Sequence, residues 1–267
     1  MNFRKNVVTR KATPYAFALP RFLDYVSRNT VRTGEHLAPI LVNSFPKSGT
    51  HLLQQIVAGI PKVRDWGLFI VSQPSRGYKL VPHKKISDTV ERIAAREIVC
   101  SHLFYSEKVS DALRARGAVN LFVDRDLRAV AVSEAHYLKS RNPFHALHQF
   151  YKHLSIDEAI TFALLGNEYI RTPYYYPNIK ERYARYSGWR HDHRCNAFRY
   201  EELLDKNGVG IERLAGILAG AGYKTSRESL SSSINPAGSH TFRAGAEAWN
   251  SEFNLSHKTI FENLTDG

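Results

Sequence analysis

The sequence of 267 residues predicts an α/β fold of three layers, in which a central, mostly parallel sheet is flanked by helices. Short apolar runs that are typical of buried strands alternate with stretches of helical spacing. One of these runs leads through a short polar turn directly into a helix. With 43% hydrophobic residues, the chain can also bury the core that one large domain needs.

The first 36 residues differ from the rest because they are basic and carry a group of aromatic and apolar side chains. We expect a basic extension, residues 1–36, that packs on the edge of a domain formed by residues 37–267. Pro14 and Pro20 interrupt the short apolar patch here, so the sequence predicts neither a signal peptide nor a membrane anchor. No apolar run reaches membrane-spanning length. We therefore expect a cytoplasmic protein without a membrane partner.

Charge and cysteine content limit the classes of function. The formal net charge of +12 and the pI of about 9.7 favour anionic ligands or partners. Cys100 and Cys195 are the only cysteines and lie outside the spacings of metal and redox motifs, which favours a reducing compartment. A nucleic-acid-binding protein is the general alternative, but the sequence has no zinc spacing, RNA-binding signature or long basic run. We expect a small anionic ligand and no nucleic-acid partner.

The first predicted strand, residues 40–42, enters a turn at residues 46–50 and then a helix. A helix that begins there directs its N-terminal N–H groups and the positive end of its dipole at the turn. Gly49 lets a ligand approach the backbone closely, and Lys47 adds a full positive charge. These features predict a phosphate or sulfate site. The alternative is that Ser48 or Thr50 simply caps the helix.

The order of residues in this turn bears on the class of nucleotide chemistry. The Walker A pattern GxxxxGK[ST] places its Lys after the second Gly, whereas Lys47 precedes Gly49 here. A P-loop kinase-like phosphotransferase is therefore the disfavoured enzyme alternative. The alternative without catalysis is a nucleic-acid-binding protein.

Further elements follow in the order that an α/β fold requires. We expect helices at 87–96, 111–116, 129–138, 156–165 and 211–221, and strands at 97–103, 119–123 and 195–200. Residues 61–82 are predicted to be irregular, either as a packed surface loop or as part of an acceptor pocket. Residues 226–233 are predicted to be a Ser-rich linker.

Two candidate site residues lie where predicted strands end. His102 ends the strand at 97–103, and Arg125 follows the strand at 119–123. The carboxyl ends of parallel strands form the crevice in which ligands of open α/β sheets bind. The alternative for His102 is a histidine that is only hydrogen-bonded at a strand end. For Arg125 it is an ion pair with Asp124 or Asp126.

Five segments together resemble the sulfotransferase family that uses 3′-phosphoadenosine 5′-phosphosulfate (PAPS), over roughly residues 38–253. In chain order they are FPKSGTHLL at 45–53, SHL at 101–103, VDRDLRAVAVS at 123–133, FRYEEL at 198–203 and HTFRAGAEAWNSEF at 240–253. The resemblance implies a P-loop-like fold. It also implies transfer of the sulfuryl group of PAPS, without a metal, to a hydroxyl or amine of a small-molecule acceptor.

The resemblance also implies roles for individual residues. His102 corresponds to the general base, and Lys47 to the cation that stabilises the leaving nucleotide. The 5′-phosphosulfate end is expected at Lys47, Ser48, Gly49 and Thr50, with His51 either beside it or facing solvent. The 3′-phosphate is expected at Arg125, Ser133, Arg243 and Gly245, and the adenine at Tyr200.

The sequence departs from the family pattern at several positions. Leu52 stands where an aromatic residue often stacks on adenine, and Cys100 replaces a Lys two residues before the histidine. Leu127 and Ala129 replace a Pro and an acidic residue. The dimer motif of the animal cytosolic branch is not readable, so the sequence predicts neither the oligomeric state nor the acceptor.

Overall fold

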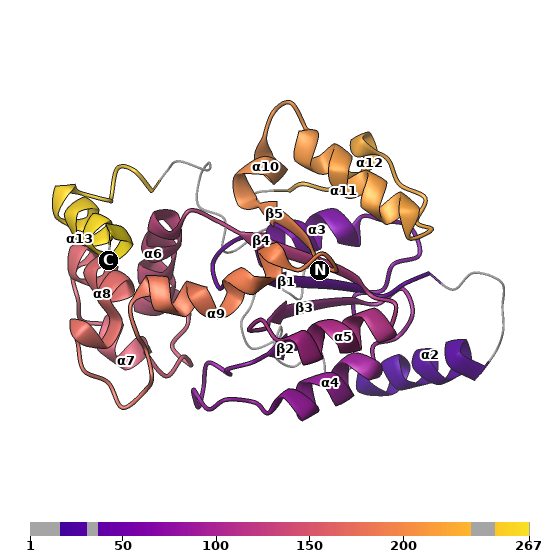
Figure 1. Ribbon diagram of the computed structural model, residues 1–267, viewed down its shortest axis with the longest axis horizontal. Helices are drawn as coiled ribbons and strands as arrows, with labels where there is room; N and C mark the ends of the chain where they lie inside the picture. The colour runs from indigo at the N-terminus through magenta and orange to yellow at the C-terminus, as the bar shows by residue number, and fades with distance from the viewer. Residues whose placement is uncertain (1–16, 31–36, 236–248, 267) are drawn as a thin grey trace.

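The computed structural model describes residues 17–30, 37–235 and 249–266. Its centre is a five-stranded, entirely parallel sheet with the strand order β2-β3-β1-β4-β5 (Figure 1). The strands are β1 Ile40–Ser44, β2 Phe69–Val71, β3 Ile98–His102, β4 Val119–Asp124 and β5 Asn196–Arg199. The predicted α/β fold with helices on both sides of a parallel sheet is confirmed.

Helices join the strands and cover the sheet. They are α2 Ala18–Thr30, α3 Thr50–Ala58, α4 His83–Glu91, α5 Glu107–Ala115, α6 Leu127–His136, α7 His148–Tyr151, α8 Ile156–Leu165, α9 Ile179–His191, α10 Tyr200–Leu204, α11 Val209–Gly220, α12 Arg227–Ser232 and α13 Leu255–Asp266. A π-helix, η2 Tyr137–Arg141, extends α6, and a 3₁₀ turn, η3 Gly166–Glu168, follows α8.

The two faces of the sheet bury different sets of side chains, because successive strand residues point to opposite sides. Ile40 and Val42 of β1 pack in a cluster with apolar residues of α3 and α11. Leu41 of β1 and Phe122 of β4 pack in a second cluster with residues of α4, α5 and α9. In Figure 1, α3, α11 and α12 accordingly lie above the sheet, and α4 and α5 lie below it. Burial on both faces explains why the strands read as continuous apolar runs.

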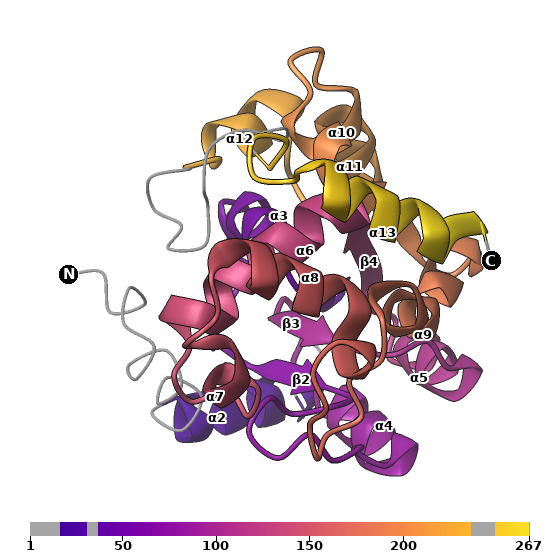
Figure 2. The same cartoon turned by 90° about the vertical axis from the view of Figure 1, so that its left-hand side faces the viewer.

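A group of helices lies beyond the carboxyl ends of the strands. Figure 2 looks onto this end, with α6, α7, α8 and α13 in front of the arrowheads of the strands. α8 contacts both α6 and α13. It begins with a capping box, in which the Ser155 side chain accepts from Glu158 N and the Glu158 carboxylate accepts from Ser155 N. The strand ends therefore face a helical layer and not open solvent alone.

Helix α2 and the residue before it contact the domain through Arg21 and Phe17, and the Arg21 guanidinium also donates to the carbonyl oxygen of Arg92 at 2.9 Å. The Arg21 guanidinium forms an ion pair with the buried Glu97 carboxylate, at 2.6 Å between Nε and Oε1. The ring of Phe17, just before the helix, lies 5.5 Å from that of Trp66. The predicted domain boundary between residues 36 and 37 stays a prediction.

Three predicted elements are wrong in part. The segment predicted as irregular contains β2, whose three residues pair with β3 at the sheet edge. The predicted Ser-rich linker contains α12, because the Ser226 side chain accepts from Ser229 N and Leu230 is buried. The helix predicted at 87–96 is α4, which begins at His83 directly after Pro82. It ends already at Glu91, where the C-cap Arg92 has left the helical conformation, with a ψ of 8°.

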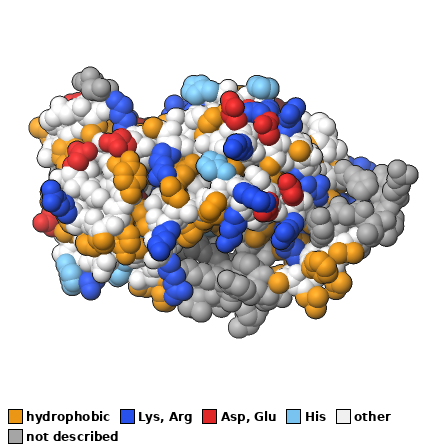
Figure 3. Space-filling model, turned by 60° about the horizontal axis from the view of Figure 1, so that its bottom comes forward, with side chains coloured by type: hydrophobic (Ala, Val, Ile, Leu, Met, Phe, Trp, Pro, Cys, Tyr) orange, Lys and Arg blue, Asp and Glu red, His pale blue; other side chains and the backbone are white. Residues whose placement is uncertain are grey.

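The charged side chains do not gather on the face shown in Figure 3. There, Lys and Arg side chains are scattered among acidic and hydrophobic ones and form no continuous basic stripe over the described residues. In the described ranges, no helix combines the length and the apolar character that a membrane span requires.

Candidate active site

The turn between β1 and α3 has an unusual backbone. Lys47 has a φ of 69° and Gly49, the N-cap residue of α3, has a φ of 112°. The helix begins at Thr50, so the alternative in which Ser48 or Thr50 caps it is wrong. Ser48 N donates to the carbonyl oxygen of Phe45 at 3.1 Å. The Ser48 hydroxyl is buried and has no hydrogen-bond partner among the described residues.

Residues that follow three different strands meet at this turn. Tyr200, directly after β5, is buried with its ring against Gly49, where a Cβ atom would lie 2.4 Å from Tyr200 Cδ2. Arg125, directly after β4, holds its guanidinium carbon 4.3 Å from the centre of the same ring. The structure thus brings together Gly49, Arg125 and Tyr200, which the sequence predicts as ligand-binding residues.

Replacing Gly49 with Ala should destabilise the protein. A left-handed φ costs a residue with a Cβ roughly 1–2 kcal/mol, and displacement of the Tyr200 ring adds to this. We expect a lower free energy of unfolding in denaturant titrations. The matched control is Gly216→Ala in α11, where a Cβ meets nothing within 4 Å and helix propensity should raise stability by about 0.5–1 kcal/mol. Equal stability of Gly49→Ala and the wild type would contradict the close packing at this turn.

Arg125 is partly withdrawn from solvent. Burial lowers the pKa of its guanidinium from the ordinary value, while Tyr200 and Glu201 act in the opposite direction. The Arg125 Nε lies 3.8 Å from Glu201 Oε1, which is longer than a hydrogen bond.

The predicted alternative partners of Arg125 are engaged elsewhere. Asp124 accepts from the Arg190 guanidinium at 2.6 Å and from the Tyr183 hydroxyl at 2.5 Å. Asp126 accepts from the Arg128 side chain and backbone and caps α6. Asp126 also acts electrostatically on the Arg125 guanidinium, but the carboxylate that lies within ion-pair distance of it among the described residues is that of Glu201.

Of the other residues predicted to bind the 3′-phosphate, the structure describes only Ser133. Ser133 lies half-buried on α6, the helix that begins two residues after Arg125. Arg243 and Gly245 lie outside the described residues. Their predicted roles, like that of Ser133, stay predictions.

His102 ends β3 beside the carboxyl end of β1. Its Nδ1 lies 3.0 Å from the carbonyl oxygen of Ser44 and 3.2 Å from the Ser44 hydroxyl. A carbonyl oxygen can only accept, so Nδ1 carries the proton and the lone pair of a neutral imidazole lies on Nε2. The Ser44 hydroxyl is in turn 2.5 Å from Thr50 Oγ1. The histidine is thus hydrogen-bonded at the strand end through Nδ1, and its predicted role as a base stays a prediction.

Asn43 fixes the backbone around this histidine. Its buried side chain donates to Leu103 O at 3.2 Å and accepts from Leu103 N at 2.8 Å and Ser101 Oγ at 3.0 Å. Trp189 Nε1 also donates to Leu103 O, at 2.8 Å. Asn43 is not among the residues that the sequence predicts for the site. The signal was a polar residue directly after the apolar run 40–42, in a strand buried on both faces.

Two of the residues at which the sequence departs from the family pattern lie near this turn and belong to the hydrophobic core. Leu52 and Cys100 are both buried in the cluster between the sheet and α3. His51 is half-buried, with Nδ1 3.2 Å from Gln54 Oε1, and Gln54 donates to Asp65. The binding role predicted for His51 stays a prediction.

Lys47 contacts an aromatic ring that the sequence analysis did not single out. Its Nζ lies 3.9 Å from the centre of the Tyr137 ring, within the range of a cation–π contact. Tyr137 is the first residue of the π-helix η2, one helical turn after Ser133. A tyrosine four residues after a candidate ligand residue on a helix was the available signal.

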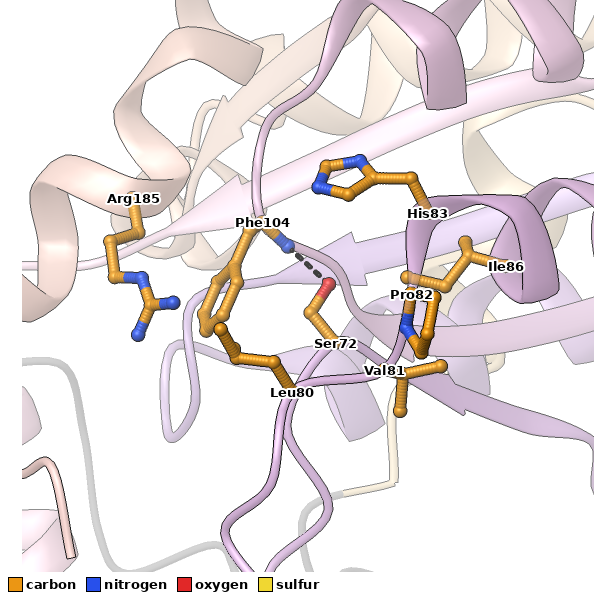
Figure 4. A pocket seen from close by; sticks show the side chains of 8 residues that line it. All are labelled: Ser72, Leu80, Val81, Pro82, His83, Ile86, Phe104 and Arg185. Atoms are coloured by element: carbon orange, nitrogen blue, oxygen red, sulfur yellow. Dashed lines mark hydrogen bonds between the residues drawn. The ribbon is translucent and has the colours of Figure 1, made fainter.

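A pocket of about 300 Å³ opens beside the end of β3 (Figure 4). Its apolar wall comes mainly from residues 80–82, Ile86 and Phe104, and Arg185 and His83 lie on opposite sides of it. Ser72 N donates to His102 O, and the Ser72 hydroxyl accepts from Phe104 N at 2.9 Å. The segment predicted as a loop or an acceptor pocket therefore lines a cavity near the end of β3, and His102 is not among the residues that line it.

No cluster of three or more His, Cys, Asp or Glu side chains suited to a metal ion occurs within residues 17–30, 37–235 and 249–266.

Comparisons with known proteins show the family of the chain and agree with its fold. The model of the sulfotransferase domain family matches residues 37–255. Mouse sulfotransferase SULT7A1, complexed with PAP, is similar at a TM-score of 0.57 and 18% identity, over 90% of this chain and 86% of that one. Retinol dehydratase in complex with androsterone and inactive cofactor PAP is similar at a TM-score of 0.54 and 17% identity, over 93% and 84% of the two chains. A search of curated protein sequences finds no match.

Proposed function

The chain belongs to the sulfotransferase domain family, and on that basis we propose that it transfers the sulfuryl group of PAPS to a hydroxyl or amine of a small-molecule acceptor. The observation that carries the proposal is the meeting of the β1–α3 turn with Arg125 and Tyr200. This arrangement offers two cations, Lys47 and Arg125, on segments from different strands. A nucleotide with anionic groups at both ends of its ribose requires such a pair.

The residues present fit this donor on three counts. The Ser48 hydroxyl is buried without a hydrogen-bond partner among the described residues, so an anionic oxygen at the turn would satisfy it. The N-terminal N–H groups of α3 point at the same turn. The Arg125 guanidinium is desolvated and stacked on Tyr200, which suits two-point pairing with a phosphate.

The roles of the side chains follow from their positions. Bound PAPS supplies a sulfuryl group together with a nucleotide leaving group that gains negative charge. His102 accepts the proton of the acceptor hydroxyl or amine at Nε2, because Nδ1 donates to Ser44. Lys47 provides positive charge at the turn, and Arg125 orients the nucleotide from its other end. Positioning and electrostatic stabilisation carry most of the catalysis in transfers of this type.

Ligand-induced thermal shifts test the proposal against both alternatives. We expect adenosine 3′,5′-bisphosphate to raise the melting temperature, since a ligand that binds the folded state stabilises it by mass action. ATP with Mg²⁺ and a mixed-sequence oligonucleotide should have little effect. A shift with ATP and Mg²⁺ alone would favour the kinase-like alternative. A shift with the oligonucleotide that disappears in salt would favour nucleic-acid binding.

We also propose that the pocket of Figure 4, which lies near the end of β3, holds a part of the acceptor that is remote from its reacting group. Its wall includes Phe104, two residues after His102, whereas the His102 imidazole, against which the Phe69 ring packs edge-on at 5.0 Å, lies outside the pocket. The Arg185 guanidinium carbon lies 3.7 Å from the centre of the Phe104 ring. A cation on an apolar wall favours an acceptor that carries an acidic group away from its reacting hydroxyl.

Sulfate transfer to a matched pair of acceptors tests the role of Arg185. We expect a lower KM for 4-(hydroxymethyl)benzoate than for benzyl alcohol. In Arg185→Gln, the ratio of the two KM values should fall roughly tenfold. Arg76→Gln is the matched control, since Arg76 is exposed and lies over Phe144 at 5.9 Å. If Arg185→Gln keeps the preference, the pocket does not recognise the acceptor. The proposal for donor binding does not depend on this result.

A further inference from the structure

Lys47 is held in a specific place before any ligand arrives. Its backbone has a left-handed φ of 69°, which is uncommon for a residue with a side chain of this size. Its side chain is half-buried, and the ammonium lies over the Tyr137 ring at 3.9 Å. A lysine side chain has four rotatable carbon bonds and is otherwise mobile at a surface.

Two hydrogen bonds from Asn142 hold the Tyr137 side chain and backbone in place. The buried Asn142 donates from Nδ2 to the Tyr137 hydroxyl at 3.0 Å, and Asn142 N donates to Tyr137 O at 3.1 Å. These two bonds span the π-helix η2, and single π-helical turns occur often at functional sites. The ring therefore offers a stationary surface to the ammonium.

We infer that Tyr137 is the positioning residue of Lys47: its ring keeps the ammonium at the turn, so that the cation is in place when the sulfuryl donor binds. The inference rests on the proposed function. Tyr137 also continues the helix that carries Ser133, so the contact joins the β1–α3 turn to α6. Loss of the ring removes this contact from the ammonium, and we expect the effect in turnover more than in donor affinity.

The contact can be observed without turnover. In the donor-free protein, the side-chain NMR signals of Lys47, assigned by their loss in Lys47→Arg, should show the upfield ring-current shift of a group above an aromatic face. We expect Tyr137→Phe to keep this shift and Tyr137→Leu to lose it. A shift that survives in Tyr137→Leu would overturn the inference, whatever reaction the protein catalyses.

Turnover measurements then separate positioning from packing. We expect Tyr137→Leu to lower kcat with PAPS about tenfold, with the affinity for adenosine 3′,5′-bisphosphate changed less than about threefold, and Tyr137→Phe to keep most of the activity. In a Lys47→Ala background, Tyr137→Leu should cause no further loss. An equal loss in both backgrounds, or a loss in Tyr137→Phe as large as in Tyr137→Leu, would overturn the inference. A wild type that binds no bisphosphate and transfers no sulfate would instead refute the proposed function.

Discussion

Replacing His102 with Ala should lower turnover with PAPS and a saturating acceptor by about 10²- to 10⁴-fold, the usual contribution of a general base. The structure orients the imidazole through the bond from Nδ1 to Ser44 O, which leaves Nε2 as the basic atom. The binding of adenosine 3′,5′-bisphosphate should be retained, because Lys47, Ser48 and Arg125 stay in place. Single-turnover assays and a bisphosphate titration measure the two effects separately.

The control for this variant is His153→Ala, which removes an exposed histidine. It should leave both turnover and bisphosphate affinity unchanged. If His102→Ala turns over as fast as the wild type, the general-base role has to move to another group. If it loses bisphosphate affinity as well, His102 contributes to donor binding and the kinetic loss does not isolate a proton transfer.

Replacing Arg125 with Ala should weaken the binding of adenosine 3′,5′-bisphosphate by about 100-fold, because hydrogen bonds to charged groups contribute roughly 1.5–3 kcal/mol each. Adenosine 5′-monophosphate, which lacks the 3′-phosphate, should lose much less. The difference arises because the desolvated guanidinium is expected at the 3′-phosphate and not at the 5′ end. Isothermal titration of both nucleotides to both proteins gives the comparison.

The control for Arg125→Ala is the replacement of a surface arginine, which shows the effect on nucleotide affinity of losing one positive charge. The Arg114 side chain is 71% exposed on α5, so Arg114→Ala removes the same formal charge far from the turn. It should leave both affinities unchanged at physiological salt. Equal losses for the two nucleotides in Arg125→Ala would mean that Arg125 acts on the adenosine or through Tyr200, and its assignment to the 3′-phosphate would be wrong.

The sequence predicts the framework of this protein well because local patterns determine most of it. The apolar runs identify β1, β3 and β4 to within two residues, since these strands are buried on both faces. β2 escapes detection because three residues at a sheet edge carry no periodicity. α12 escapes because its sequence is rich in serine, and only Leu230 anchors it.

The contacts within the site depend on residues that are far apart in the chain, and the sequence predicts them poorly. Nothing local in the sequence indicates that the Tyr200 ring lies against Gly49, or that Glu201 and not Asp124 lies beside Arg125. The contact between Lys47 and Tyr137 is of the same kind. Motif order identified most of the candidate residues, and only the folded chain shows which of them meet.

The all-parallel sheet has a consequence for how the protein acquires its structure. Each pair of neighbouring strands joins segments that are remote in sequence; Asn43 and Ser101, which hydrogen-bond across β1 and β3, are 58 positions apart. Chains dominated by such remote contacts fold slowly, because loop-closure entropy is lost before the contacts form. The ring of Tyr200 reaches the β1–α3 turn only when the last strand has paired with β4. Refolding from denaturant should therefore recover secondary structure before it recovers affinity for a bisphosphorylated nucleotide.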